Sequence, residues 1–502
     1  MRRPLIKGDC RIRRVKCDEQ KPSCRRCSST GRACDWITQK TSKSTKDVTA
    51  SASAPLVLQK AILAKIPAAK SLELRGFEFF MSRTAPEMTY FHSDFWQQLV
   101  LQLSHSDSMV LRAAIALGTL HENEESLGMG ISKDRMYDSR HRFGVAQYNA
   151  AISLLLNKRL DEDRDVKAAT LATCLIFVHI ELVRGRYGPA VEHIRSGLKI
   201  LNMNHSDDYM QSSIQSALAT AFMRLDLQCA HFDDAGTAIE YNYNDLVRYK
   251  QTVPRSGFDR LHVVKQQGDK LIGTTFKFLK VCEHIRDADI SIDDPAFFER
   301  QRNLRSFHIA YRSELDSLMC HPDIIISERH WQSALLMKMQ VIASYIQVSG
   351  ILAKDKEVAY DEHVIDFTEV VALAEKFILS SSESSGFRKQ RQTLSADWGI
   401  VPPLFLTAIK CREHFIRRKA VALLEAWPHR EGFWDSALAG KFAKELVGIE
   451  EADAAIPGVP RRVVRTTIIN ADIVEEQTHF VLTFSRMRDS IRGPKEALSV
   501  PI

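Results

Sequence analysis

The stretch that decides the organisation of this chain covers residues 7–34 and reads KGDCRIRRVKCDEQKPSCRRCSSTGRAC. Its cysteines are Cys10, Cys17, Cys24, Cys27 and Cys34. The second half has the spacing C-x2-C-x6-C, and the first half repeats this spacing except that Lys7 stands where the second half has Cys24. Five closely spaced thiolate donors predict a zinc site, because thiolates bind zinc strongly and short connections between ligands cost little entropy to close.

The same stretch is strongly basic. Between Cys10 and Cys17 lie the six residues RIRRVK, of which four are cations. Up to residue 34 the chain has eleven Lys and Arg against three Asp and Glu (11 − 3 = +8), so the other residues sum to 7 − 8 = −1. A metal-folded module that carries a basic segment is typical of nucleic-acid binding, whereas the near-neutral body implies no polyanionic partner.

These residues resemble the DNA-binding domain of the fungal binuclear zinc-cluster transcription factors. That family has six cysteines in the pattern C-x2-C-x6-C-x(5–12)-C-x2-C-x6–8-C, and the five cysteines of this chain match the second to the sixth. Lys7 takes the place of the first. The resemblance implies two zinc ions that share two bridging thiolates, of which Cys24 is one and the absent first cysteine is the other. The ligands left to the two ions are Cys10, Cys17 and Cys24 for one, and Cys24, Cys27 and Cys34 for the other.

In that family the residues between the second and third cysteines form a short helix that reads a CGG triplet in the major groove of DNA. The resemblance places Arg13 and Arg14 at the base edges, and Arg11 and Lys16 nearer the phosphates. An arginine fork suits this role, because it can donate two hydrogen bonds to guanine. Non-specific attraction to phosphates is expected of Lys21, Arg25 and Arg26. The alternative is that RIRRVK is only a nuclear import signal or a solvated run of charge.

Composition divides the chain into a zinc-cluster module (1–37), a linker (38–70), a helical regulatory domain (71–490) and a tail (491–502). The linker is rich in Ser, Thr and Lys and has few large apolar residues, which predicts flexibility. An apolar segment at 56–66 ends at Pro67, before enough heptads accumulate for a coiled coil. A homodimer is therefore left open, without a zipper to support it.

The body is predicted to be mainly α-helical. Apolar residues recur at helical spacing, as in the series Phe143, Ala146, Ala150 and Leu154, and Gly185–Pro189 separates two helical runs. Two β-branched segments near the end, 463–470 and 478–484, predict a short hairpin. The body also resembles the helical regulatory domain that follows the cluster in many fungal transcription factors, through the stretches 73–88, 110–122, 190–201, 222–232 and 411–436.

Other candidate chemistry is sparse, and no enzyme is predicted. The acid pairs Asp207-Asp208, Asp233-Asp234 and Asp293-Asp294 are typical of helix caps or loops. His179-Ile180-Glu181 matches part of a deaminase motif, but no P-C-x-x-C follows it. His193 is expected to be a core histidine with its hydrogen bonds satisfied. Core thiols are predicted for the remaining cysteines, Cys174, Cys229, Cys282, Cys320 and Cys411.

The sequence thus predicts a nuclear, zinc-dependent regulator of RNA polymerase II genes, whose partners are double-stranded DNA and the transcription machinery or co-regulators. No membrane partner is expected, because the most apolar run, 168–180, is shorter than the roughly 20 residues of a spanning helix. One alternative is a helical interaction protein whose cluster is degenerate because of Lys7, or whose N-terminus is wrongly assigned ahead of Gly8. Another alternative is a helical enzyme or ligand-binding domain with a vestigial finger.

Overall fold

The structure, a computed structural model, describes residues 71–90, 95–129, 138–158, 163–202, 213–230, 258–287, 294–321, 327–383, 391–454, 465–473, 479–488 and 491–501. The chain divides into two compact units, Met1–Lys65 and Ile66–Ile502, and all described residues belong to the second. The zinc-cluster module and the linker predicted at 1–37 and 38–70 lie outside the described residues.

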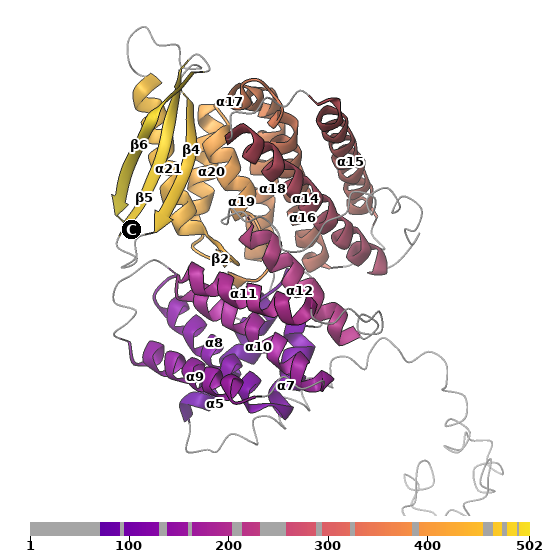
Figure 1. The fold of residues 1–502 in the computed structure, drawn as a ribbon, viewed down its shortest axis with the longest axis vertical. Helices are drawn as coiled ribbons and strands as arrows, with labels where there is room; N and C mark the ends of the chain where they lie inside the picture. The colour runs from indigo at the N-terminus through magenta and orange to yellow at the C-terminus, as the bar shows by residue number, and fades with distance from the viewer. Residues whose placement is uncertain are drawn as a thin grey trace, which may run out of the picture. The chain divides into compact units, whose positions relative to one another are not determined.

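The first half of the described unit is a helical bundle built around one apolar helix (Figure 1). Its elements are α5 (Ser71–Phe79), η1 (Phe80–Thr84), α6 (Ala85–Glu87), η2 (Phe95–Leu99), α7 (Val100–Ser106), α8 (Ser108–Ser126), α9 (Ser139–Leu156), α10 (Arg164–Val183), α11 (Tyr187–Asn202) and α12 (Ser213–Cys229). Helix α10 packs against α8, α11 and α12. Aspartates begin three of these helices, because Asp107, Asp138 and Asp163 each accept a backbone N–H of the first turn at 2.8–2.9 Å.

Helix α10 is the core helix of this bundle. Within the described ranges it is the one helix long and apolar enough to cross a membrane, and 89% of that apolar window is buried inside the fold. The helix extends beyond the apolar run predicted at 168–180 at both ends. The break predicted at Gly185–Pro189 is confirmed: α10 ends at Val183, Gly185 has a φ of 72°, and α11 begins at Tyr187.

The second half contains the largest hydrophobic core of the described residues. Its helices are α14 (Phe258–Asp287), α15 (Pro295–Met319), α16 (Glu328–Gly350), α17 (Lys356–Ala359), η6 (Tyr360–His363), α18 (Val364–Glu383), α19 (Val401–Lys410), α20 (His414–Ala426) and α21 (Ser436–Ala454). The fully buried side chains of Leu335, Ile342 and Ile346 place α16 in this core, between α15 and α18. Asp294 caps α15 by accepting the N–H of Ala296, as expected for one of the acid pairs.

A three-stranded antiparallel sheet follows these helices, in the order β4 (Arg465–Ile473), β5 (His479–Arg488) and β6 (Ile491–Pro501). Figure 1 shows it beside α21, and the buried Phe484 and partly buried Leu498 join it to the core. The predicted hairpin is confirmed as β4 and β5. The tail predicted at 491–502 is corrected, because β6 pairs along β5. The sequence does not predict this strand, because Gly493 and Pro494 are typical of turns. An edge strand nevertheless tolerates proline.

A second, smaller sheet holds the two halves together. It consists of β1 (Leu394–Ser395), β2 (Arg430–Glu431) and β3 (Trp434–Asp435), with β2 parallel to β1 and antiparallel to β3. The segment around β1, residues 391–399, contacts both halves through its backbone. Its hydrogen bonds are Ala396 N–H to Met88 O, Gln228 Nε2 to Ala396 O and Gln340 Nε2 to Trp398 O, each at 2.7 Å.

Two predictions about side-chain placement need correction. Helix α9 is confirmed, but its buried face contains Gly144, Gln147, Tyr148 and Ala151 instead of the apolar series that begins at Phe143. Polar and small residues are buried there because α9 packs closely against α8. Among the cysteines outside the zinc-cluster stretch, four are buried as predicted, whereas Cys320 is exposed at the end of α15.

Candidate functional site

The predicted zinc ligands and DNA-contacting residues all lie outside the described residues. They are Cys10, Cys17, Cys24, Cys27 and Cys34 for zinc, and Arg11, Arg13, Arg14, Lys16, Lys21, Arg25 and Arg26 for DNA. These assignments therefore remain predictions. In the described residues, two places gather chemically versatile side chains: a polar cluster at the end of α8 and a cavity between the bundle and α14.

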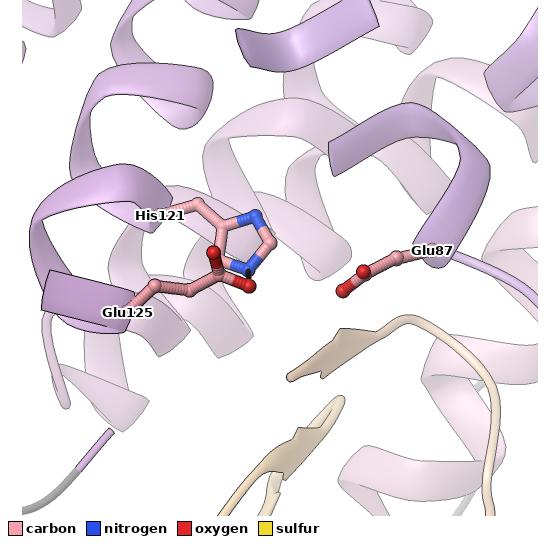
Figure 2. Close-up of side chains that lie close together, drawn as sticks. All are labelled: Glu87, His121 and Glu125. Carbon is pink, nitrogen blue, oxygen red and sulfur yellow. Dashed lines mark ion pairs between the residues drawn. The ribbon is translucent and has the colours of Figure 1, made fainter. Parts of the chain in front are cut away.

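The polar cluster brings together Glu87, His121 and Glu125, whose ligand atoms lie within 4.8 Å of one another (Figure 2). His121 and Glu125 are one turn apart on α8, and Glu87 points toward them from α6. The His121 ring lies 3.0 Å from Thr84 Oγ1 through Nδ1 and 2.8 Å from Thr393 Oγ1 through Nε2. Burial lowers the pKa of His121 to about 4, so the ring is neutral near pH 7.

A metal ion does not fit this donor set, because a guanidinium already occupies the place of the cation. Arg83 pairs with Glu87 and, through Nη2 at 2.6 Å, with Glu125. A divalent ion between the same carboxylates would be repelled by Arg83 and would have to displace the hydroxyl partner of the His121 nitrogen that it binds. Burial raises the pKa of Glu87 to about 8 despite Arg83. The cluster is a hydrogen-bonded link from α6 and α8 to residues 391–399, since Thr393 Oγ1 lies 2.8 Å from His121 Nε2 and Thr393 N–H donates to Glu87 Oε2 at 3.0 Å.

The cavity has a volume of about 250 Å³ and is lined by η2, α10, α12, α14 and the 391–399 segment. Apolar side chains form one part of its wall, and they are Phe95, Trp96, Leu175, Ala217, Ala221 and Leu225. Polar groups form the rest, of which His179, Thr89 and Asp397 are the most buried. The walls therefore come from both halves of the domain.

His179 is the unusual residue of this cavity. It is 1% exposed, and neither ring nitrogen has a hydrogen-bond partner in the structure. Trp96 packs edge-on against it, with ring centroids 5.1 Å apart and planes at 73°. Burial alone lowers the pKa of His179 to about 3, so its ring is neutral near pH 7. By contrast, His193 has a hydrogen-bond partner as predicted, because its Nε2 lies 3.0 Å from Tyr148 Oη, but it is half-buried instead of a core residue.

The charges beside the cavity form a balanced chain. Arg224 bonds to Asp397 Oδ1 at 3.2 Å and to Asp269 Oδ2 at 3.4 Å. Lys265 pairs with Asp269, and Thr89 donates to Asp397. Burial opposes the charge of Arg224, but the two aspartates outweigh burial and raise its pKa. Two cations thus face two carboxylates, so this chain leaves no net charge to attract an ion.

The sequence contained partial signals for both places. His121 and Glu125 have the i, i+4 spacing that puts two side chains on one helix face. Arg224 interrupts the apolar residues of the stretch 222–232. Neither signal identifies its distant partners, because Thr393 and Asp397 reach the sites only through the fold. The fragment His179-Ile180-Glu181 is not an acid–base pair, since Glu181 bonds to Arg184 instead.

Comparisons with known proteins cover most of the chain. Residues 8–44 match the fungal Zn(2)-Cys(6) binuclear cluster domain, and residues 75–343 match the fungal specific transcription factor domain. The chain is 23% identical over 549 residues to the aspercryptin biosynthesis cluster-specific transcription regulator atnN of Emericella nidulans, with 89% of this chain and 87% of that protein covered. It is 31% identical over 208 residues to the transcription regulator lscL of Purpureocillium lilacinum, with 38% of this chain and 47% of that protein covered. No solved structure matches it.

Proposed function

Because the chain belongs to the fungal-specific transcription factor family and is a transcription regulator, we propose that it acts in the nucleus by zinc-dependent, sequence-specific binding to double-stranded DNA. The observation that carries the proposal is the match of residues 8–44 to the zinc-cluster domain, in which five cysteines keep the spacing of the family around the basic run RIRRVK. The helical domain, which the structure describes from residue 71 onward, would be the regulatory part. The proposal assigns no reaction to the chain.

The donor set suits zinc but is one thiolate short. Cys10, Cys17, Cys24, Cys27 and Cys34 would hold the metal, and its binding free energy would fold a segment too short to build a core of its own. A protonated Lys7 has no lone pair to offer, and the match to the cluster domain begins at Gly8, just after it. Each of two ions would keep three sulfurs, with the fourth position left to water or another donor.

DNA recognition follows from the basic residues of this module. Arg13 and Arg14 would reach guanine edges of a CGG-type triplet, and Arg11 and Lys16 would contact the phosphates beside it. Lys21, Arg25 and Arg26 would add attraction that falls steeply with salt. The likeness to atnN, whose name describes a biosynthesis cluster-specific regulator, supports genes of a biosynthetic cluster as the target class.

The test is the zinc content of the full-length protein, measured by native mass spectrometry beside a Lys7→Cys variant. We expect two zinc ions per chain in both proteins, together with loss of DNA binding after chelation. Fewer than two in the native sequence, with two in the variant, would reject zinc-dependent DNA reading by this chain. A helical interaction protein with a degenerate cluster would then be the better description.

A further inference from the structure

We propose that the cavity between η2, α10, α12, α14 and the 391–399 segment binds a small, uncharged aromatic molecule that carries a hydroxyl group, with His179 as the residue that recognises the hydroxyl. The inference goes beyond the proposed function and does not rest on it, because no DNA contact or zinc ligand takes part. Four features of the cavity lead to it.

The first feature is the unsatisfied histidine. Buried polar groups are nearly always hydrogen-bonded, so a buried side chain with two unpartnered nitrogens requires an explanation. His179 lines the cavity with both ring nitrogens unpartnered, unlike the equally buried His308 of α15. The nitrogens of His308 lie 2.8 Å from Leu304 O and 2.9 Å from Ser344 Oγ. A hydroxyl group from outside the chain would provide a partner for one of the two nitrogens of His179.

The second feature is the chemistry that a neutral imidazole can recognise. Its ring has one N–H donor and one acceptor nitrogen, and the tautomer decides which nitrogen has which role. A hydroxyl group both donates and accepts, so it bonds to either nitrogen. A carbonyl would fit only the donor, and an ammonium group would fit only the acceptor. A hydroxyl is therefore the simplest group that suits both tautomers.

The third feature is the balance of charge. Arg224 is held by Asp397 and Asp269, and Lys265 is held by Asp269. An anionic ligand would have to compete with these carboxylates for Arg224, and a cationic ligand would have to compete with the guanidinium and ammonium groups. A charged ligand of either sign would thus replace one partner of a partly buried ion pair, and this cost favours an uncharged ligand.

The fourth feature is the shape of the apolar wall. Trp96 and Phe95 lie on one side, with ring centroids 4.7 Å apart, and Leu175 and Leu225 lie on the walls from α10 and α12. A cavity of roughly 150 Å³ already admits benzene. The volume of about 250 Å³ therefore suits a molecule of about two fused rings, with its edge or face against the aromatic side chains.

The experiment titrates the full-length protein, without DNA, with three probes of one frame: 2-naphthol, naphthalene and the anion 2-naphthoate. Calorimetry measures affinity, and the shift in unfolding temperature provides a second readout, because a ligand that binds the folded state stabilises it. We expect saturable binding of 2-naphthol that is at least tenfold tighter than binding of naphthalene. We also expect 2-naphthoate to bind more weakly than 2-naphthol.

Three variants make the result specific. His179→Leu should weaken 2-naphthol about tenfold, to the level of naphthalene, while naphthalene binding is retained. Ala221→Leu should block both by filling the cavity, and His308→Leu should leave both affinities unchanged because His308 lies outside the cavity. The inference is overturned if 2-naphthol does not bind, if it binds no better than naphthalene, if 2-naphthoate binds more tightly, or if folded His179→Leu binds as the native protein does.

Discussion

The carboxylate of Glu431 caps the start of helix α19 and lies directly against Gly399. Its oxygens accept three successive backbone N–H groups, from Gly399 at 2.9 Å, Ile400 at 2.8 Å and Val401 at 3.0 Å. Glu431 is completely buried, and a Cβ on Gly399 would lie only 2.0 Å from its Oε1. A residue of β2 thus satisfies the first N–H groups of a helix 30 residues earlier, and a glycine makes room for it.

Glu431→Gln should strongly destabilise the helical domain. The amide keeps the volume of the side chain but has one oxygen for three N–H donors, and its own NH₂ faces one of them. We expect the free energy of unfolding to fall by about 2–4 kcal/mol, measured by urea denaturation. The matched control is Glu425→Gln, which removes an exposed pair with Lys444 and should change stability by less than about 0.5 kcal/mol. Equal effects of the two substitutions would contradict the capping role.

The buried histidines His179 and His308 should respond oppositely to substitution by leucine. His179→Leu removes two unpartnered nitrogens, so we expect the free energy of unfolding at pH 7 to rise by about 1 kcal/mol. His308→Leu removes the bond to Ser344 Oγ and should lower it by about 2 kcal/mol. Denaturation curves of the full-length variants, without added ligand, make the comparison. If His179→Leu destabilises as much as His308→Leu does, His179 has a structural role instead of an open binding capacity.

The stability of the native protein should also depend on pH through His179. Burial lowers its pKa from the ordinary 6.5 to about 3, so the unfolded chain takes up a proton between these values that the folded chain excludes. The free energy of unfolding is therefore unaffected by this proton above pH 6.5 and decreases as the pH falls from 6.5 toward 3. Between pH 7 and pH 5 the native protein should therefore lose about 2 kcal/mol more stability than His179→Leu does. Parallel pH curves for the two proteins would refute a neutral, buried His179.

Local sequence signals predicted the elements of this fold better than their contacts. The apolar run of α10 and the break at Gly185 are local features: the break appears as predicted, and the helix is longer than the run at both ends. The buried face of α9 was predicted wrongly, because close packing against α8 favours Gly144 over the larger apolar residues. A Cβ on Gly144 would lie 2.8 Å from Leu120.

The polar cluster around His121 and the cavity beside His179 could not be predicted from local sequence for a related reason. Arg224 and Asp397 are 173 residues apart, and His121 contacts Thr84 and Thr393, which are 37 and 272 residues away from it in the sequence. Local periodicity gives the face of a helix but not the side chains that meet it from elsewhere in the chain. The zinc and DNA-binding sites, by contrast, can be predicted from local sequence, because their cysteines and arginines are close together in the chain.

Arg14→Ala should weaken binding to a CGG-containing duplex far more than binding to a scrambled duplex. The substitution removes a guanidinium that would bond to guanine, and we expect a loss of about 1–3 kcal/mol on the CGG duplex. Lys21→Ala is the matched control, because loss of a phosphate contact should weaken both duplexes to a similar extent and reduce the salt dependence. Fluorescence anisotropy at two salt concentrations measures both effects. An Arg14→Ala variant that loses affinity equally on the two duplexes would show that Arg14 does not read bases.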